Sequence, residues 1–156
     1  MGQYHWTVNL DKKEFISPHK IGLGLKMAEQ VGDFHATTGD ILFLLLACSH
    51  SRGGGDVPAE GIEDMLGRWA GDRVIVIGDY SEPSDVPGID ASQIIQSIFD
   101  NEDGLPQPEW TDISELLRPL ILKLWGVDME GGGWMQRKTV AYYPEAYLGE
   151  FNKEID

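Results

Sequence analysis

Residues 74–77, with the sequence VIVI, form the longest β-branched apolar run of the chain. Such a run packs well in a pleated sheet, and because it is apolar on both alternating faces it predicts a strand buried on both sides. Gly71-Asp72 precedes the run and Gly78-Asp79 follows it, and glycine next to aspartate is typical of tight turns. We therefore expect a central buried strand over about residues 73–78, with one carboxylate at each end.

The N-terminal segment predicts a β-hairpin. Residues 4–8 have the composition of a strand, and residues 14–16 are apolar enough to pair with them. The sequence NLDKK between them supplies turn chemistry, so residues 3–17 are expected to form one hairpin that ends at Pro18.

Helical patterns follow the hairpin. We expect helices over residues 25–31, 41–49, 60–66, 91–99 and 112–125. Thr37 and Asp40 have the spacing of a capping box before the second helix, which is apolar nearly all round and is expected to be buried together with Cys48. Pro119 predicts a kink or two abutting helices in the last one.

A last strand is expected over residues 134–143, followed from about residue 144 by a loosely held tail. Strands and helices do not alternate regularly, so the pattern predicts an α+β fold rather than a doubly wound one. The expected architecture is a small, mostly antiparallel sheet covered by three to four helices, in a single domain over residues 1–156.

Charge adds one strong constraint. The 156-residue chain has a formal net charge of −14, which argues against direct binding to nucleic acid or to an anionic membrane surface. Ten acidic residues and no Lys or Arg lie in residues 74–117: Asp79, Glu82, Asp85, Asp90, Asp100, Glu102, Asp103, Glu109, Asp112 and Glu115. This segment indicates either a solvated surface or an acidic face for a basic partner, including one that normally binds nucleic acid.

The compartment follows from weaker signals. Cys48 is the only cysteine, so no internal disulfide can form, and the first residues lack the basic and apolar regions of a signal peptide. The apolar run over residues 41–48 is far too short to span a membrane. We expect a cytoplasmic protein without a membrane partner.

The glycine-rich loop RGGGD is a candidate anion site. Its glycines would leave backbone N–H groups free to surround an anion, and Arg52 would supply charge. It lacks the Gly-Lys-Ser/Thr ending of a nucleotide-binding P-loop, and a flexible linker is the alternative. The residues concerned are Arg52, Gly53, Gly54, Gly55 and Asp56.

A divalent metal ion is a second hypothesis, because Asp56, Asp72 and Asp79 all lie in glycine-flanked turns and oxygen ligands suit Mg²⁺ or Ca²⁺. An extended strand would hold Asp72 and Asp79 about 20 Å apart, so at most one of them would join Asp56. The histidine spacing and the single cysteine do not favour zinc.

Further candidates surround the predicted central strand. Arg68, Asp72 and Arg73 provide charge for a ligand, and Trp69 could form one wall of a pocket. His19 is the one histidine considered for acid–base chemistry, with Lys20 beside it, although the favoured interpretation is a turn histidine bonded to the backbone.

Four segments carry a resemblance: NLDK at residues 9–12, PHK at 18–20, RGGGD at 52–56, and GRWAGDR at 67–73 with GDY at 78–80. In this order they resemble an uncharacterised family of proteins from bacteria, phages and some fungi. The resemblance covers most of residues 2–80 and implies no activity.

Three functions remain open from the sequence. The first is an acidic binding module that holds a small anionic or polar molecule with the glycine, arginine and aspartate loops. The second is a hydrolase of phosphate or glycosidic bonds that uses Asp56 or Asp72. The third is an acidic interaction or inhibitor protein that binds a basic partner through residues 74–117.

Overall fold

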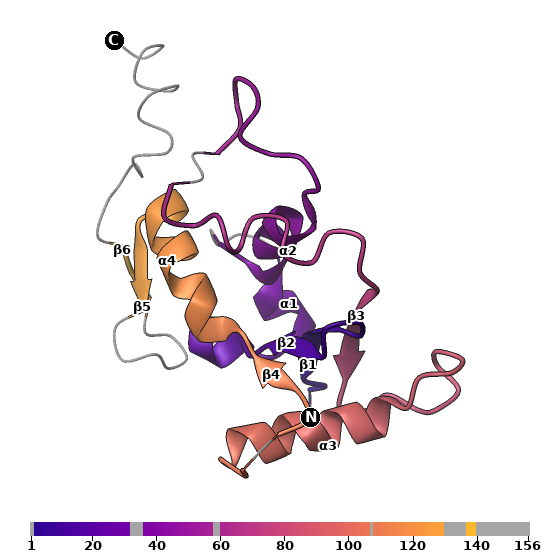
Figure 1. The fold of residues 1–156 in the computed structure, drawn as a ribbon. Helices are drawn as coiled ribbons and strands as arrows, with labels where there is room; N and C mark the ends of the chain where they lie inside the picture. The colour runs from indigo at the N-terminus through magenta and orange to yellow at the C-terminus, as the bar shows by residue number, and fades with distance from the viewer. Residues whose placement is uncertain (1, 32–35, 58–59, 107, 130–136, 140–156) are drawn as a thin grey trace.

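The computed structural model describes residues 2–31, 36–57, 60–106, 108–129 and 137–139 of the chain (Figure 1). Its main sheet is mixed and has four strands, in the order β3-β1-β2-β4. β1 pairs antiparallel with β2 and with β3, while β2 and β4 are parallel. The strands are β1 (His5–Asn9), β2 (Glu14–Ile16), β3 (Val74–Gly78) and β4 (Thr111–Asp112). The predicted α+β class is thereby confirmed.

The N-terminal hairpin also forms as predicted. Thr7 lies opposite Ile16 in the β1–β2 ladder. The side-chain oxygen of Asn9 accepts hydrogen bonds from the backbone N–H groups of Asp11 and Lys12, at 2.9 and 2.8 Å. This local bond explains why NLDKK turns the chain.

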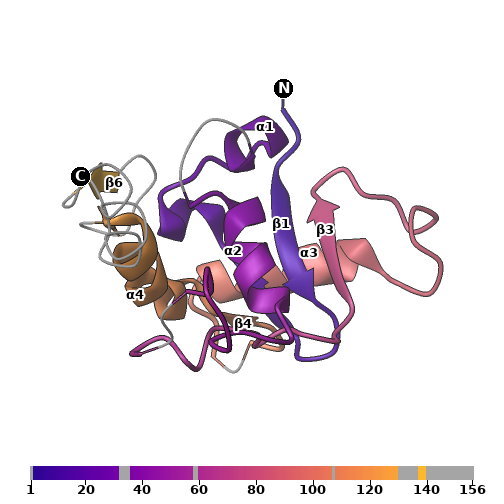
Figure 2. The ribbon, with the colours of Figure 1, turned by 90° about the horizontal axis from the view of Figure 1, so that it is seen from above.

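Helices lie on both faces of the sheet (Figures 1 and 2). On one face lie α1 and α2, with the 3₁₀ helix η1 and helix α4 beside them, and on the other face lies α3. Their bounds are η1 (Pro18–Ile21), α1 (Met27–Gln30), α2 (Thr38–Leu46), α3 (Ala91–Glu102) and α4 (Ser114–Trp125). Each face has its own core: Ile16 and Trp69 belong to the first, and Trp6, Phe15 and Ile98 to the second.

The strand over residues 74–78 exists, but the prediction that it is central and buried is wrong. β3 is an edge strand, and its Val76 is 53% exposed. The central position belongs to β1, in which all five residues are buried. An edge strand has only one neighbour, so the pattern VIVI indicated the strand but not its place in the sheet.

Helix α2 has the predicted capping box. The backbone N–H of Asp40 donates to Thr37 Oγ1 at 3.2 Å, and the N–H of Thr37 donates to Asp40 Oδ2 at 3.1 Å. The helix is not buried all round, however, because Phe43 is 76% exposed and Cys48, after its end, is exposed as well. Only one side of this surface helix packs against the core. Its apolar outer residues are exposed, so apolar composition alone did not predict burial.

The helix predicted over residues 60–66 is absent and the chain forms consecutive turns there. Gly61 and Gly67 have positive φ angles of 85° and 74°, which interrupt any helix between them. Two backbone N–H groups of this segment bond to the end of α2 instead: that of Gly67 to the carbonyl of Leu44 at 2.9 Å, and that of Trp69 to Leu45 at 2.8 Å. The turns thus satisfy carbonyl groups that a helix end leaves free.

The remaining elements follow the sequence more closely. α3 is longer than expected, and α4 is one helix that continues through Pro119 and ends at Gly126, with φ of 64°. The N-cap of α4 is Ile113, not Asp112, whose Oδ1 accepts the N–H of Ser114. A second small sheet pairs β5 (Val127–Met129), where no strand was predicted, with β6 (Arg137–Thr139). The rest of the strand predicted over 134–143, and the tail from 144, fall outside the described residues.

Candidate functional site

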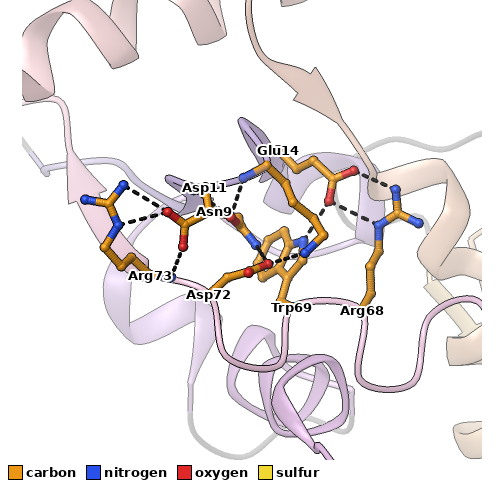
Figure 3. A network of polar contacts seen from close by, with 8 residues as sticks. Asn9, Asp11, Glu14, Arg68, Trp69, Asp72 and Arg73 are labelled. Atoms are coloured by element: carbon orange, nitrogen blue, oxygen red, sulfur yellow. Dashed lines mark hydrogen bonds and ion pairs between the residues drawn. The ribbon is translucent and has the colours of Figure 1, made fainter.

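The charged residues around β3 are paired with the hairpin turn (Figure 3). Asp72 Oδ2 accepts a hydrogen bond from Asn9 Nδ2 at 2.8 Å and forms an ion pair with Lys12. These two contacts, with the Lys12 bond the larger, lower the pKa of Asp72. Asp72 was predicted to contact a ligand, but its carboxylate instead connects the start of β3 to the hairpin turn.

Arg73 belongs to the same network. Its backbone N–H donates to Asp11 Oδ2 at 2.7 Å, and its Nε donates to Asp11 Oδ1 at 2.9 Å. The backbone bond and the guanidinium lower the pKa of Asp11. Figure 3 shows this pair beside the Asp72 pair, at the end of β3 where the chain enters the strand.

Glu14 forms the third ion pair of the network, with Arg68. Arg68 donates to it twice, from Nε at 3.1 Å and from Nη2 at 2.6 Å, and the indole N–H of Trp69 donates to its Oε1 at 2.8 Å. Burial by itself raises the pKa of Glu14, but the bonds from Arg68 and Trp69 outweigh it and the net pKa is lowered. Trp69 has no exposed surface, so the prediction that it walls a ligand pocket is wrong.

Asp79 has the equivalent role at the other end of β3. Its Oδ1 accepts the backbone N–H of Tyr4 at 2.9 Å, and its own N–H donates to the carbonyl of Tyr4 at 3.0 Å. The two carboxylates expected at the ends of the strand are thus present, and each fastens β3 to the segment that contains β1.

The loop over residues 52–56 is held by hydrogen bonds to the carboxylate of its own Asp56. Asp56 Oδ2 accepts the backbone N–H groups of Arg52 and Gly53, at 2.7 and 3.0 Å, and these bonds lower its pKa. Gly54 and Gly55 are exposed. The carboxylate of Asp56 thus occupies two of the N–H groups that the anion hypothesis assigned to a ligand.

His19 and Lys20 lie in η1, which packs against α4. Lys20 Nζ lies 2.8 Å from Asp112 Oδ2; burial lowers the pKa of Lys20, but Asp112 and other carboxylates outweigh it, so the net pKa is raised. Burial lowers the pKa of His19, against an opposing effect of Glu29. In the part of the chain that the structure describes, no three His, Cys, Asp or Glu side chains are grouped to hold a metal ion.

The structure reveals a pocket that the sequence did not predict. It has a volume of about 210 Å³ and a wall made almost wholly of carbon atoms. Its lining comes from the β1–β3 part of the sheet and from α1, α2 and the residue after α1. Its lining comprises His5, Thr7, Met27, Gln30, Val31, Thr38, Gly39, Leu42 and Val76.

Polar side chains hold the helices over this part of the sheet. Gln30 Nε2 donates to the carbonyl of His5 at 2.8 Å, and Thr38 Oγ1 donates to Gln30 Oε1 at 3.0 Å. The sequence signal was the alternation of His5 and Thr7 with Trp6 and Val8 in β1. Alternation of this kind normally indicates one solvated face, but here both faces are covered.

A second hollow of about 230 Å³ borders the network, lined in part by Arg73, Asp90, Glu109 and Trp110. Arg73 and Glu109 already form ion pairs, with Asp11 and Lys13. This hollow therefore offers a ligand few unpaired charges.

The structure therefore defines an α+β protein with a network of paired polar side chains and an apolar pocket beside β1. Comparison of the chain with protein families, curated proteins and solved structures finds no match. The resemblance to the uncharacterised family stays a prediction. Among the described residues, no helix is both long and apolar enough to cross a membrane.

Proposed function

We propose that this protein is a binding module for a small molecule, and that its site is the pocket over β1. The observation that carries the proposal is an apolar cavity of about 210 Å³ set against the buried polar side chains His5 and Thr7. Ligand sites are commonly apolar hollows with a few polar groups, and the size suits a molecule smaller than most cofactors.

The loops around β3 are a less favourable ligand site than the pocket, because their charged residues are already paired. Arg68, Asp72 and Arg73 already have partners in the hairpin, so a ligand would have to displace them. A hydrolase has less support as well. Asp56 and Asp72 both have lowered pKa values because each accepts hydrogen bonds within the fold, so neither is suited to act as a general acid, and each would have to leave these bonds to contact a substrate.

The test is a titration of ¹⁵N-labelled protein with a set of uncharged single-ring molecules, followed by amide chemical shifts. We expect shifts that saturate at Thr7, Val31 and Leu42, which line the pocket. A molecule present at 100 times its dissociation constant should also raise the free energy of unfolding by about 2.7 kcal/mol.

Gly39 supplies the matched variants. It lines the pocket, and a Cβ added there meets only Thr37 Oγ1, at 3.7 Å. Gly39→Leu adds a bulky apolar side chain at the edge of the pocket and should weaken binding, while Gly39→Ala should retain the saturating shifts. If Gly39→Leu binds as well as the unchanged protein, the site lies elsewhere.

A second candidate function, binding of a basic partner, is favoured by the placement of the acidic residues. Seven of the ten lie in the loop between β3 and α3, in α3 itself or directly after it, and none of the seven forms an ion pair with a described residue. Helix α3 lies at the bottom of Figure 1. They are Asp79, Glu82, Asp85, Asp90, Asp100, Glu102 and Asp103. The other three pair with Lys13, Lys20 and Arg118.

A lysine-rich peptide is the probe for this second function. The dissociation constant of its complex with the protein should rise at least tenfold between 0.05 and about 0.5 M NaCl. Salt screens the attraction between exposed charges, and the screening length is only about 8 Å at physiological ionic strength and shorter above it. The double variant Glu82→Gln, Asp103→Asn should weaken binding more than Glu60→Gln, Asp64→Asn, which removes equal charge outside residues 79–103. Equal effects of the two double variants would show that net charge alone attracts the peptide.

A further inference from the structure

Two side chains of the pocket lack hydrogen-bond partners. His5 is 9% exposed and Thr7 is 1% exposed, and within the described chain neither Nδ1 of His5 nor Oγ1 of Thr7 has a partner. A buried polar atom left unpaired lowers stability by about 1–3 kcal/mol, so such atoms are uncommon in folded proteins. A group that pairs with a ligand is one reason for a protein to keep them.

Two of the four buried side-chain atoms that lack a hydrogen-bond partner among the described residues belong to the pocket. The other two are Trp6 Nε1, on the opposite face of β1, and Asp112 Oδ2, which forms an ion pair with Lys20. Asn9 lies two residues beyond Thr7 on the same face of β1, and its side chain is bonded to Asp72 and to the turn. Gln30 and Thr38, on the opposite side of the pocket, are bonded to each other. On this face of β1, the atoms without partners belong to His5 and Thr7, the two residues of the strand that line the cavity.

Rotamer changes of His5 and Thr7 would present these atoms to a ligand. The pocket wall is almost wholly carbon, and both polar atoms are covered. Rotation of Thr7 by about 120° about χ1 brings its hydroxyl group to the place of its methyl group, and a half-turn of the His5 ring exchanges Nδ1 with Cδ2. A ligand with one polar group would gain a hydrogen bond and at the same time relieve an unpaired buried atom.

Size and charge narrow the ligand. An apolar cavity of about 150 Å³ is known to hold benzene, and this pocket is only somewhat larger. No Lys, Arg, Asp or Glu is among the described residues that line it, and burying an unpaired charge is costly. Residues 5 and 7 lie about 6.6 Å apart along the strand, which one ring with a substituent can span.

We infer that the pocket takes an uncharged single-ring aromatic molecule that carries one hydroxyl group, with the ring against Val31, Leu42 and Val76 and the hydroxyl bonded to Thr7 or His5. This inference rests on the proposed function and specifies its ligand class.

Phenol and toluene are the probes, because they have the same shape and differ by the hydroxyl group. An apolar pocket alone favours toluene, the less water-soluble of the two. In the unchanged protein we expect phenol to bind at least as tightly as toluene, measured by amide-shift titration. In Thr7→Val or His5→Phe the ratio of the two dissociation constants should move at least tenfold toward toluene.

Thr7→Val has a second readout. Valine has the shape of threonine without the unpaired hydroxyl, so the free variant should unfold at a higher urea concentration than the unchanged protein. Thr111→Val, at an exposed position of β4, is the control and should change neither the urea midpoint nor the ratio. The inference is supported if phenol preference is lost in Thr7→Val or in His5→Phe and if free Thr7→Val is more stable than the unchanged protein.

Two negative results have different meanings. If both probes give shifts at the pocket but neither variant alters their ratio, the ligand class is wrong and the pocket remains a binding site. If no uncharged ring molecule gives saturating shifts at the pocket, the proposed function itself is wrong.

Discussion

At the scale of single residues, Gly67 shows how closely the segment after α2 is fitted to it. Its backbone has a φ of 74°, and a Cβ added there would lie 2.6 Å from the carbonyl oxygen of Ala47. The contact is with backbone, so no side-chain rotation relieves it. Gly71 has a similar φ of 81°, but a Cβ there would meet nothing within 4 Å.

These two glycines give a matched pair of variants. We expect Gly67→Ala to lower the free energy of unfolding by about 3 kcal/mol, since it adds a backbone clash to the strain of a left-handed conformation. Gly71→Ala has the strain alone and should lower it by about 1 kcal/mol. Urea unfolding measures both, and equal losses would mean that Ala47 does not crowd residue 67.

At the scale of elements, Glu14 connects β2 with the turn segment over residues 60–73. Arg68 and Trp69 lie 54 and 55 residues after Glu14 in the sequence, yet both donate hydrogen bonds to its carboxylate. Glu14 is buried, with 7% of its surface exposed, so these bonds replace those it would make to water. We consider this contact the main polar link between the two segments.

Glu14→Gln tests that link. It removes the charge opposite Arg68 and should lower the free energy of unfolding at pH 7 by about 2–4 kcal/mol. Glu109→Gln is the control, because Glu109 pairs with Lys13 on the surface and its loss should cost no more than about 1 kcal/mol.

The effect of Glu14→Gln should depend on pH. The pKa of Glu14 is lowered from its ordinary value of 4.5, so the folded state favours the ionised form. Its contribution to stability is present above pH 4.5 and is lost as the pH falls through the lowered pKa. Unfolding measured from pH 7 to 3 should show the variant and the unchanged protein converging below pH 4.5; a constant difference would contradict this account.

At the scale of the whole molecule, the sheet separates two different environments. The side with α3 has an apolar core around Trp6 and Phe15, and the seven acidic residues without ion pairs to described residues lie in α3, in the loop before it or directly after it. The side with α1 and α2 combines an apolar core with polar side chains of β1, and the pocket lies there. The two candidate functions therefore use opposite sides, and a variant that impairs one should leave the other intact.

The sequence by itself determined what depends on neighbours in the chain. The capping box of Thr37 and Asp40, the hairpin turn at Asn9 and the end of α4 at Gly126 are local hydrogen-bond or backbone patterns. Such patterns are complete within a few residues, so they could be recognised without tertiary structure.

Only the tertiary structure decided which strand is central and which charges are free. β3 has the most strand-like composition but takes the edge, because position in a sheet depends on which other strands pair with it. Arg68, Asp72 and Arg73 resemble ligand-binding residues until their partners in residues 9–14 are known. The polar face of β1 became a candidate site for the same reason, since α1 and α2 cover side chains that strand alternation alone would leave in solvent.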